Sequence, residues 1–367
     1  MSLEEEDVNR HEVGSVHVNH QVPVGAVSEI NSRGERMKRS AVLLAVIVAG
    51  VVWSTVTTPA SAVPCSGVSF GAPFAGSYAC SDLGTPTGVP GLLGGITFLD
   101  SSTLLIGGNA NNSGGVIDQI GVTRGTGNHI TGFSGSATLF STAPFIDGGL
   151  SFGSSGVLFF TGYPNNTLGE IKSGSASPNK TILLSTLSPP VESSVGALAF
   201  VPGGFAGAGE FKIVSYNSGG WYTGTLTPDG SGTFDLSVVK NTSLGGADPE
   251  GMVYVHGSNP GFGVDSILVS KYNSGKIAAY TIDLNGDPIP ATTRDFLTGL
   301  SGAEGAVIDP LTGDFLFSTF GGGNRVVVIS GFEAPPPPPG VPEPASLLLL
   351  GSGLLALAGV AWRRHRA

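Results

Sequence analysis

The feature that most constrains this chain is a segment that recurs five times, a glycine followed by a short strand of alternating apolar residues. Successive repeat glycines are 54, 47, 55 and 54 residues apart. Self-similarity at such a period is typical of repeat architectures, in which each unit must pack against its neighbours to bury its apolar face. The glycines that mark the repeats are Gly95, Gly149, Gly196, Gly251 and Gly305.

Each repeat goes on with further apolar runs that are separated by tight turns. The turn after the second run is rich in Asn and Gly, as in the segments that begin at Tyr163, Tyr216, Tyr272 and Phe320. Asn tolerates a positive φ and Gly accepts it freely, so these turns suit hairpins. A third run follows in every repeat and a fourth in four of them. Four antiparallel strands about every 50 residues describe the blade of a β-propeller.

The fifth repeat lacks a fourth strand, because after Gly331-Phe332 the chain enters a proline-rich tract. Residues 68–83, before the first repeat, can supply that strand and close the ring. The sequence therefore predicts an all-β propeller of five four-stranded blades, or six if the early stretch forms a degenerate extra blade. The pattern resembles β-propellers of the NHL or YWTD-like kind, and this resemblance implies an architecture only.

The chain has two cysteines, Cys65 and Cys80, both near the start of the predicted propeller. An isolated pair in an exported protein is typical of a single disulfide. We expect this disulfide to brace the closing strand.

The N-terminal part reads as two segments ahead of the exported domain. Residues 1–36 are polar and acidic and predict a disordered extension, or a start codon assigned too early if translation begins at Met37. Residues 37–62 combine Lys38-Arg39, an apolar run and Ala60-Ser61-Ala62, which are the three parts of a secretory signal peptide. An uncleaved membrane anchor is the alternative. The exported domain is then expected at 63–332.

The C-terminal part begins with a proline-rich linker at 333–340 and continues with a tripartite segment at 341–367. That segment holds Pro342-Glu343-Pro344, an apolar stretch over 345–362 and a basic end. Eighteen residues of helix at about 1.5 Å each would span about 27 Å, close to the hydrocarbon core of a bilayer. The basic residues expected to stop the helix in the membrane are Arg363, Arg364 and Arg366.

This order of parts resembles the PEP-CTERM sorting signal of Gram-negative bacteria. The resemblance implies that Pro342, Glu343 and Pro344 are processed by an exosortase and that the following helix spans the inner membrane until then. It also implies a final location at the outer surface or outside the cell. An ordinary C-terminal anchor with a chance Pro-Glu-Pro is the alternative.

Charge excludes one class of partner. Residues 63–333 carry 9 Lys and Arg against 19 Asp and Glu, a net charge of −10. Nucleic-acid binding needs a basic surface, so no nucleic-acid partner is expected. Only His129 and His256 lie in the exported part, so a histidine-rich metal site or a Ser-His-Asp triad is not expected either.

One group of residues could carry chemistry. Asp147, Glu250 and Glu304 each precede a repeat glycine, and inner strands would bring them together at one mouth of the central channel. Hard oxygen ligands gathered in this way suit Ca²⁺. The alternative is that each carboxylate caps a turn by accepting a backbone N–H. Turn chemistry also accounts for the Asp-rich segments 283–287 and 309–314, which lack the full ligand pattern of a calcium loop.

Two function hypotheses follow from the sequence. The first is a non-catalytic envelope or matrix protein whose propeller binds an extracellular partner such as exopolysaccharide. The resemblance to the sorting signal implies this partner, because proteins of that family accompany exopolysaccharide production. The second is a calcium-dependent propeller hydrolase or lactonase that uses Asp147, Glu250 and Glu304. The first is preferred because no catalytic set stands out.

Overall fold

A computed structural model describes residues 62–246 and 248–334. These residues form five antiparallel sheets arranged around one axis, so the predicted five-bladed all-β propeller is confirmed. The predicted sorting segment, signal peptide and N-terminal extension lie outside the described residues. Among the described residues, no helix is long and apolar enough to cross a membrane.

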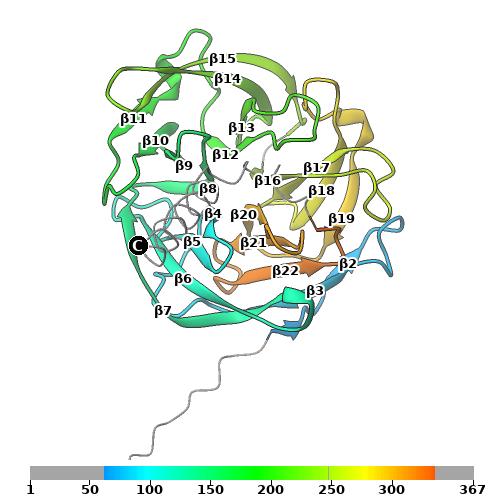
Figure 1. Cartoon of the computed structure of the whole chain (residues 1–367). Coiled ribbons are helices and arrows are strands. Elements are labelled where there is room, and N and C mark those ends of the chain that lie inside the picture. Colours follow the sequence, from blue (N-terminus) through cyan, green and yellow to red (C-terminus); the bar gives the residue numbers. More distant parts are fainter. Residues whose placement is uncertain (1–61, 247, 335–367) are drawn as a thin grey trace, which may run out of the picture. The chain divides into compact units, whose positions relative to one another are not determined.

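The five innermost strands line the axis, as Figure 1 shows. Four of them contain a repeat glycine, and the first begins directly after Gly95. They are β4 (Ile96–Asp100), β8 (Ile146–Phe152), β12 (Val195–Phe200), β16 (Pro249–Val255) and β20 (Ala303–Ile308). The second strands are β5 (Thr103–Gly108), β9 (Leu158–Gly162), β13 (Phe211–Ser215), β17 (Ser266–Lys271) and β21 (Phe315–Thr319).

The third and outer strands complete the blades. The third strands are β6 (Val116–Arg124), β10 (Thr167–Ile171), β14 (Gly220–Pro228), β18 (Lys276–Thr281) and β22 (Val326–Ser330). The outer strands of the first four blades are β7 (Ile130–Thr142), β11 (Lys180–Leu183), β15 (Phe234–Ser243) and β19 (Arg294–Thr298).

The N-terminal segment closes the ring as predicted. Strand β3 (Ala79–Asp82) pairs with β22 and supplies the fourth strand of the last blade, and the two segments lie side by side in Figure 1. Cys65 and Cys80 form the predicted disulfide, which ties β3 to the chain that follows β1 (Val63–Pro64). The sequence did not predict that β1 pairs with β3, nor that β2 (Ser69–Phe70) adds to β19 and so joins the neighbouring blade.

Close packing around the axis explains the repeat glycines. A β-carbon at Gly305 would lie 2.6 Å from the Cα of Gly95, and one at Gly149 would lie 2.8 Å from the backbone nitrogen of Leu198. Both distances are too short for real side chains. Glycine is therefore needed where one inner strand meets the next. Because this contact occurs once in every blade, the glycine recurs with the period of the blades.

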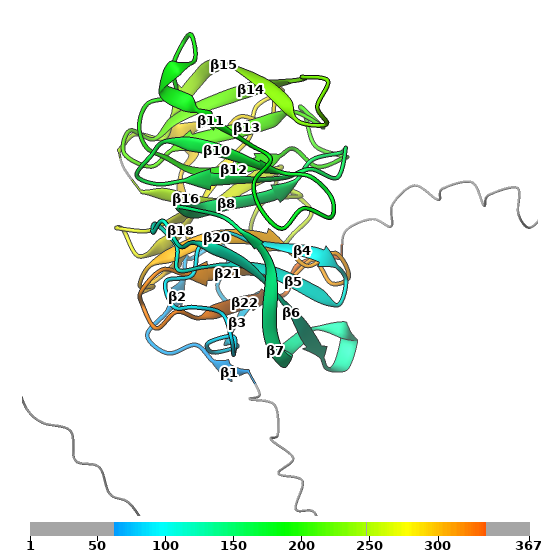
Figure 2. The same ribbon diagram turned by 90° about the vertical axis from the view of Figure 1, so that its left-hand side faces the viewer.

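A long hairpin made by β6 and β7 joins the first blade to the last (Figure 2). From this hairpin, Arg124 donates to both carboxylate oxygens of Asp309, at 2.7 and 2.9 Å. His129 Nδ1 lies 2.6 Å from Asp314 Oδ2. The Asp-rich turn 309–314 thus serves as an anchor between blades, which is a structural use rather than a calcium loop.

Candidate functional site

Asp147, Glu250 and Glu304 converge at one mouth of the central channel. Each contributes a carboxylate oxygen to a group in which these oxygens lie within 4.8 Å of one another. Their side chains come from β8, β16 and β20, three different blades. Only 1%, 4% and 1% of their surfaces are exposed. The geometric part of the expectation is thus met, whereas metal binding stays a prediction.

Irregularities in the inner strands aim these carboxylates into the channel. The pairing register shifts between Pro249 and Gly251 around Glu250, and between Ala303 and Ala306 around Glu304. A similar shift occurs in β8 around Asp147. Bulges of this kind redirect a side chain out of the regular alternation. The glycine after each carboxylate allows the bulged strand to approach its neighbour closely.

Burial makes the ionised forms of these groups costly. It raises the pKa of Asp147 to about 8 and is the largest cause of a raised pKa for Glu250 and Glu304. The charges of Asp147 and Glu304 raise the pKa of Glu250 further. No hydrogen-bond partner among the described residues reaches Asp147 Oδ2 or Glu250 Oε2. A cation bound among the three would remove this penalty.

Four aromatic side chains form an arc over the carboxylates, which we call the aromatic arc: Tyr163, Tyr216, Tyr272 and Phe320. Neighbouring ring centroids along the arc lie 5.8, 6.4 and 6.0 Å apart, each pair edge to face. The arc, Asn111, Glu250 and Glu304 line a cavity of about 270 Å³. The mouth therefore combines half-buried aromatic walls with an acidic floor.

Each arc residue directly follows the second strand of its blade, so one structural position recurs in four blades. From the sequence these segments were predicted only as turns, and their place in the lining of the cavity was not predicted. The signal was present, because the first letter of the turn is Tyr in three repeats and Phe in a fourth. The first blade departs from the pattern with Asn109 at that position.

The phenol groups of Tyr216 and Tyr272 stay protonated and can donate hydrogen bonds. Burial, with the negative charges of Glu304 and Glu250, raises the pKa of Tyr272. Burial is also the largest cause of the raised pKa of Tyr216, whose hydroxyl oxygen accepts a bond of 2.8 Å from the Asn273 amide.

Asp248, two residues before Glu250, serves the fold. Its carboxylate pairs with the buried Lys271 at 2.7 Å and accepts two bonds from Ser274, from the backbone nitrogen at 2.8 Å and the hydroxyl at 2.5 Å. The other Asp-rich turn, 283–287, caps itself, since Asp283 accepts the backbone N–H groups of Asn285 and Asp287. These groups have partners, as turn chemistry predicts.

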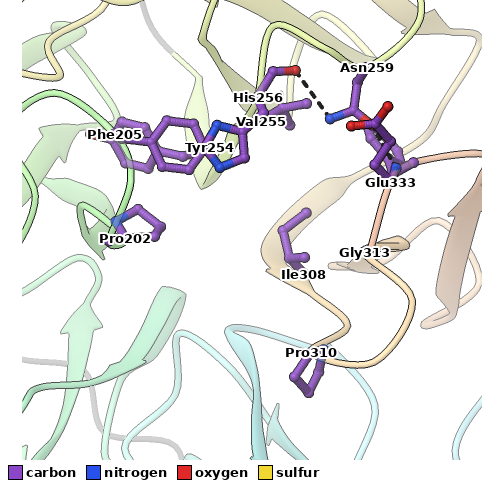
Figure 3. Close-up of a pocket in the computed structure, with 12 residues that line it drawn as sticks. Pro202, Phe205, Tyr254, Val255, His256, Asn259, Ile308, Pro310, Gly313 and Glu333 are labelled. Atoms are coloured by element: carbon purple, nitrogen blue, oxygen red, sulfur yellow. Dashed lines mark hydrogen bonds between the residues drawn. The ribbon is translucent and has the colours of Figure 1, made fainter. Parts of the chain in front are cut away.

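A second cavity, of about 360 Å³, lies where β12, β16 and β20 end, at the opposite ends of the strands that carry the carboxylates. Its lining is mostly apolar. On one side the ring of His256 stacks on Phe205, with centroids 4.0 Å apart, and Ile308 faces them across the space (Figure 3). Glu333 reaches the rim, where its backbone N–H donates to Asn259. The mouth with the carboxylates differs from this cavity because two buried carboxylates, those of Glu250 and Glu304, belong to its lining.

Comparison with known proteins identifies the C-terminal segment. The model of the PEP-CTERM protein-sorting motif matches residues 340–366, so the chain carries this motif. Pro342, Glu343, Pro344 and the arginines 363, 364 and 366 fall within the match but outside the described residues. No curated protein matches the chain.

Solved structures resemble the propeller only distantly. A gluconolactonase from Xanthomonas campestris is 12% identical over 75% of this chain and 99% of its own, with a TM-score of 0.41. The PQQ domain of pyranose dehydrogenase from Coprinopsis cinerea is 10% identical over 72% and 97%, with a TM-score of 0.38. At this level the similarity carries no argument about ligand or reaction.

Proposed function

We propose, from the premise that the chain carries a PEP-CTERM protein-sorting motif, that this protein is an exosortase substrate of the Gram-negative cell envelope whose propeller binds exopolysaccharide without catalysis. The observation that carries the binding part is the aromatic arc over a cavity of about 270 Å³. Aromatic faces bury the apolar faces of sugar rings, and phenol hydroxyls and carboxylates at the same mouth can bond sugar hydroxyls.

The binding test uses retardation of the purified protein in gels that contain neutral, acidic or amino polysaccharides. We expect at least one class to retard the wild type. Tyr216→Leu combined with Tyr272→Leu should abolish the retardation, whereas Leu284→Ala, at a 90% exposed position, should not. A double variant that is retarded like the wild type would place binding elsewhere.

The sorting part concerns residues 342–366. In our proposal the helix over 345–362 holds the protein in the inner membrane, and Arg363, Arg364 and Arg366 prevent its withdrawal because charge crosses hydrocarbon only at a cost of several kcal/mol. The exosortase then cuts at Pro342-Glu343-Pro344. Replacing these three residues with alanine should leave export intact and trap the uncut protein in the inner membrane. If that variant is released normally, the C-terminal segment is only a membrane anchor and not a processing signal.

The alternative is a calcium-dependent hydrolase or lactonase, and the three converging carboxylates are the observation that favours it. Calorimetry should decide whether Ca²⁺ binds the purified propeller and whether Glu250→Gln with Glu304→Gln abolishes binding. A metal that is bound and required for the turnover of a sugar lactone would replace the non-catalytic proposal. Ca²⁺ takes six to eight oxygen ligands, so water or ligand hydroxyls would have to complete the site.

A further inference from the structure

We infer that the mouth recognises a cationic sugar, a polysaccharide whose units carry protonated amino groups, with the ammonium group held by Asp147, Glu250 and Glu304. This inference rests on the proposed function, since it names the class of polysaccharide for the same cavity. It makes the carboxylates part of the binding site rather than a metal centre beneath it.

The spacing of the carboxylate oxygens fits an ammonium group. An ammonium nitrogen has three N–H donors in a tetrahedral arrangement, and acceptors at about 2.8 Å from it lie about 4.6 Å apart. The three carboxylates offer oxygens within 4.8 Å of one another, one from each side chain. The three oxygens are therefore close enough together for one ammonium group to contact all of them.

Two of the carboxylate oxygens at this position are buried and without partners. Glu250 is 4% exposed, lines the cavity, and its Oε2 has no hydrogen-bond partner among the described residues. Asp147 Oδ2 likewise has no hydrogen-bond partner among the described residues. A buried carboxylate oxygen without a donor costs stability unless a ligand supplies one. Within residues 62–246 and 248–334, no ion pair compensates any of the three carboxylates.

The walls above the carboxylates favour an organic cation over a bare metal ion. The ring faces of the aromatic arc carry partial negative charge and attract ammonium groups, and the rings also cover the apolar face of a sugar. If each carboxylate gave one oxygen, water would have to supply most of the six to eight ligands of Ca²⁺, whereas an ammonium group needs only three acceptors. A cavity of about 270 Å³ has room for one sugar unit at the mouth.

Calorimetry on the processed, exported protein tests the inference with two matched ligands at neutral pH, the hexamers of glucosamine and of N-acetylglucosamine. They differ only in the charge and the acetyl group on nitrogen. We expect the glucosamine hexamer to bind at least about tenfold more tightly, because a buried ion pair is lost in the other complex. Glu250→Gln with Glu304→Gln should remove this preference, whereas Glu192→Gln, an exposed carboxylate that pairs with Lys240, should keep it.

The outcomes separate this inference from the proposal beneath it. Equal affinity for the two hexamers would overturn the cationic class and leave sugar binding in place. Binding of Ca²⁺ without either hexamer would overturn both and favour the metal alternative. A preference that survives in Glu250→Gln with Glu304→Gln would overturn the assigned position of the ammonium group. Thermal unfolding of each variant verifies that it is folded.

Discussion

Two buried charged clusters in this propeller differ in one respect. Between the third and fourth blades, Lys212 is fully buried and donates to Asp287, Glu210 and Thr223, at 2.6, 2.7 and 2.7 Å. Asp287 also accepts from the Trp221 indole at 2.8 Å. At the channel mouth, three buried carboxylates come together, and no basic side chain within the described part of the chain forms an ion pair with them. The first cluster is complete within the fold, whereas we propose that a ligand completes the second.

The comparison suggests how to separate structural from functional charge in this protein. A buried ion pair that is fully hydrogen-bonded holds elements together, and removal of one partner leaves an uncompensated charge. A buried group of like charges works against folding and persists only where it serves another purpose. The two clusters should therefore respond to substitution in opposite directions.

The largest expected effect is in the complete cluster. Lys212→Met should lower the free energy of unfolding by about 3–5 kcal/mol, because it leaves Asp287 buried without its cation. Urea denaturation followed by tryptophan fluorescence would measure this loss. Lys276→Met is the matched control, since Lys276 pairs with Asp295 at the surface and should cost less than about 1 kcal/mol. Similar losses in both variants would remove the distinction between the sites.

A substitution among the three carboxylates at the channel mouth should instead raise the free energy of unfolding. Burial and the neighbouring Asp147 raise the pKa of Glu304, so its carboxyl opposes folding at a pH where the unfolded chain ionises it. Glu304→Gln removes this group, and the unliganded protein should therefore gain about 1–2 kcal/mol of stability at neutral pH. The same denaturation experiment, with a chelator present, would detect the gain. A loss as large as that of Lys212→Met would mean that Glu304 is a structural group and that the mouth is not a binding site.

The smallest expected effect is on the pH dependence of stability, which Glu170 contributes to. Glu170 is buried, its Oε2 accepts the Phe234 N–H at 2.8 Å, and burial raises its pKa to about 7. Between about 4.5 and about 7 the unfolded chain is ionised here while the native state holds the proton, so stability falls as pH rises through this window. Above about 7 this contribution is constant.

Glu170→Gln should therefore have a melting temperature that changes less with pH, and its advantage over the wild type should grow from acidic to neutral pH. Glu192→Gln is the control with the opposite sign, because the hydrogen bond from Lys240 lowers the pKa of Glu192 and that side chain stabilises the protein more as pH rises. Parallel pH profiles for Glu170→Gln and the wild type would contradict the assigned cause.

The propeller architecture could be predicted from the sequence because close packing at the axis requires glycine at one position in every blade. A glycine is required wherever one inner strand meets the next, so Gly95 and its four counterparts repeat at the period of the blades. The missing fourth strand and the two cysteines similarly predicted closure through β3. The extra pairing of β2 with β19 was not predicted, since two residues carry no periodic signal.

The sequence by itself determined the blade repeat, the sorting motif and the position of three carboxylates next to repeat glycines. Only the tertiary structure decided that these carboxylates meet at one place. Residues 103 and 54 positions apart along the chain meet because bulged inner strands from three blades converge on one axis. The aromatic arc depends on the same convergence, since a tyrosine in a turn becomes a binding wall only when neighbouring blades place equivalent rings about 6 Å away.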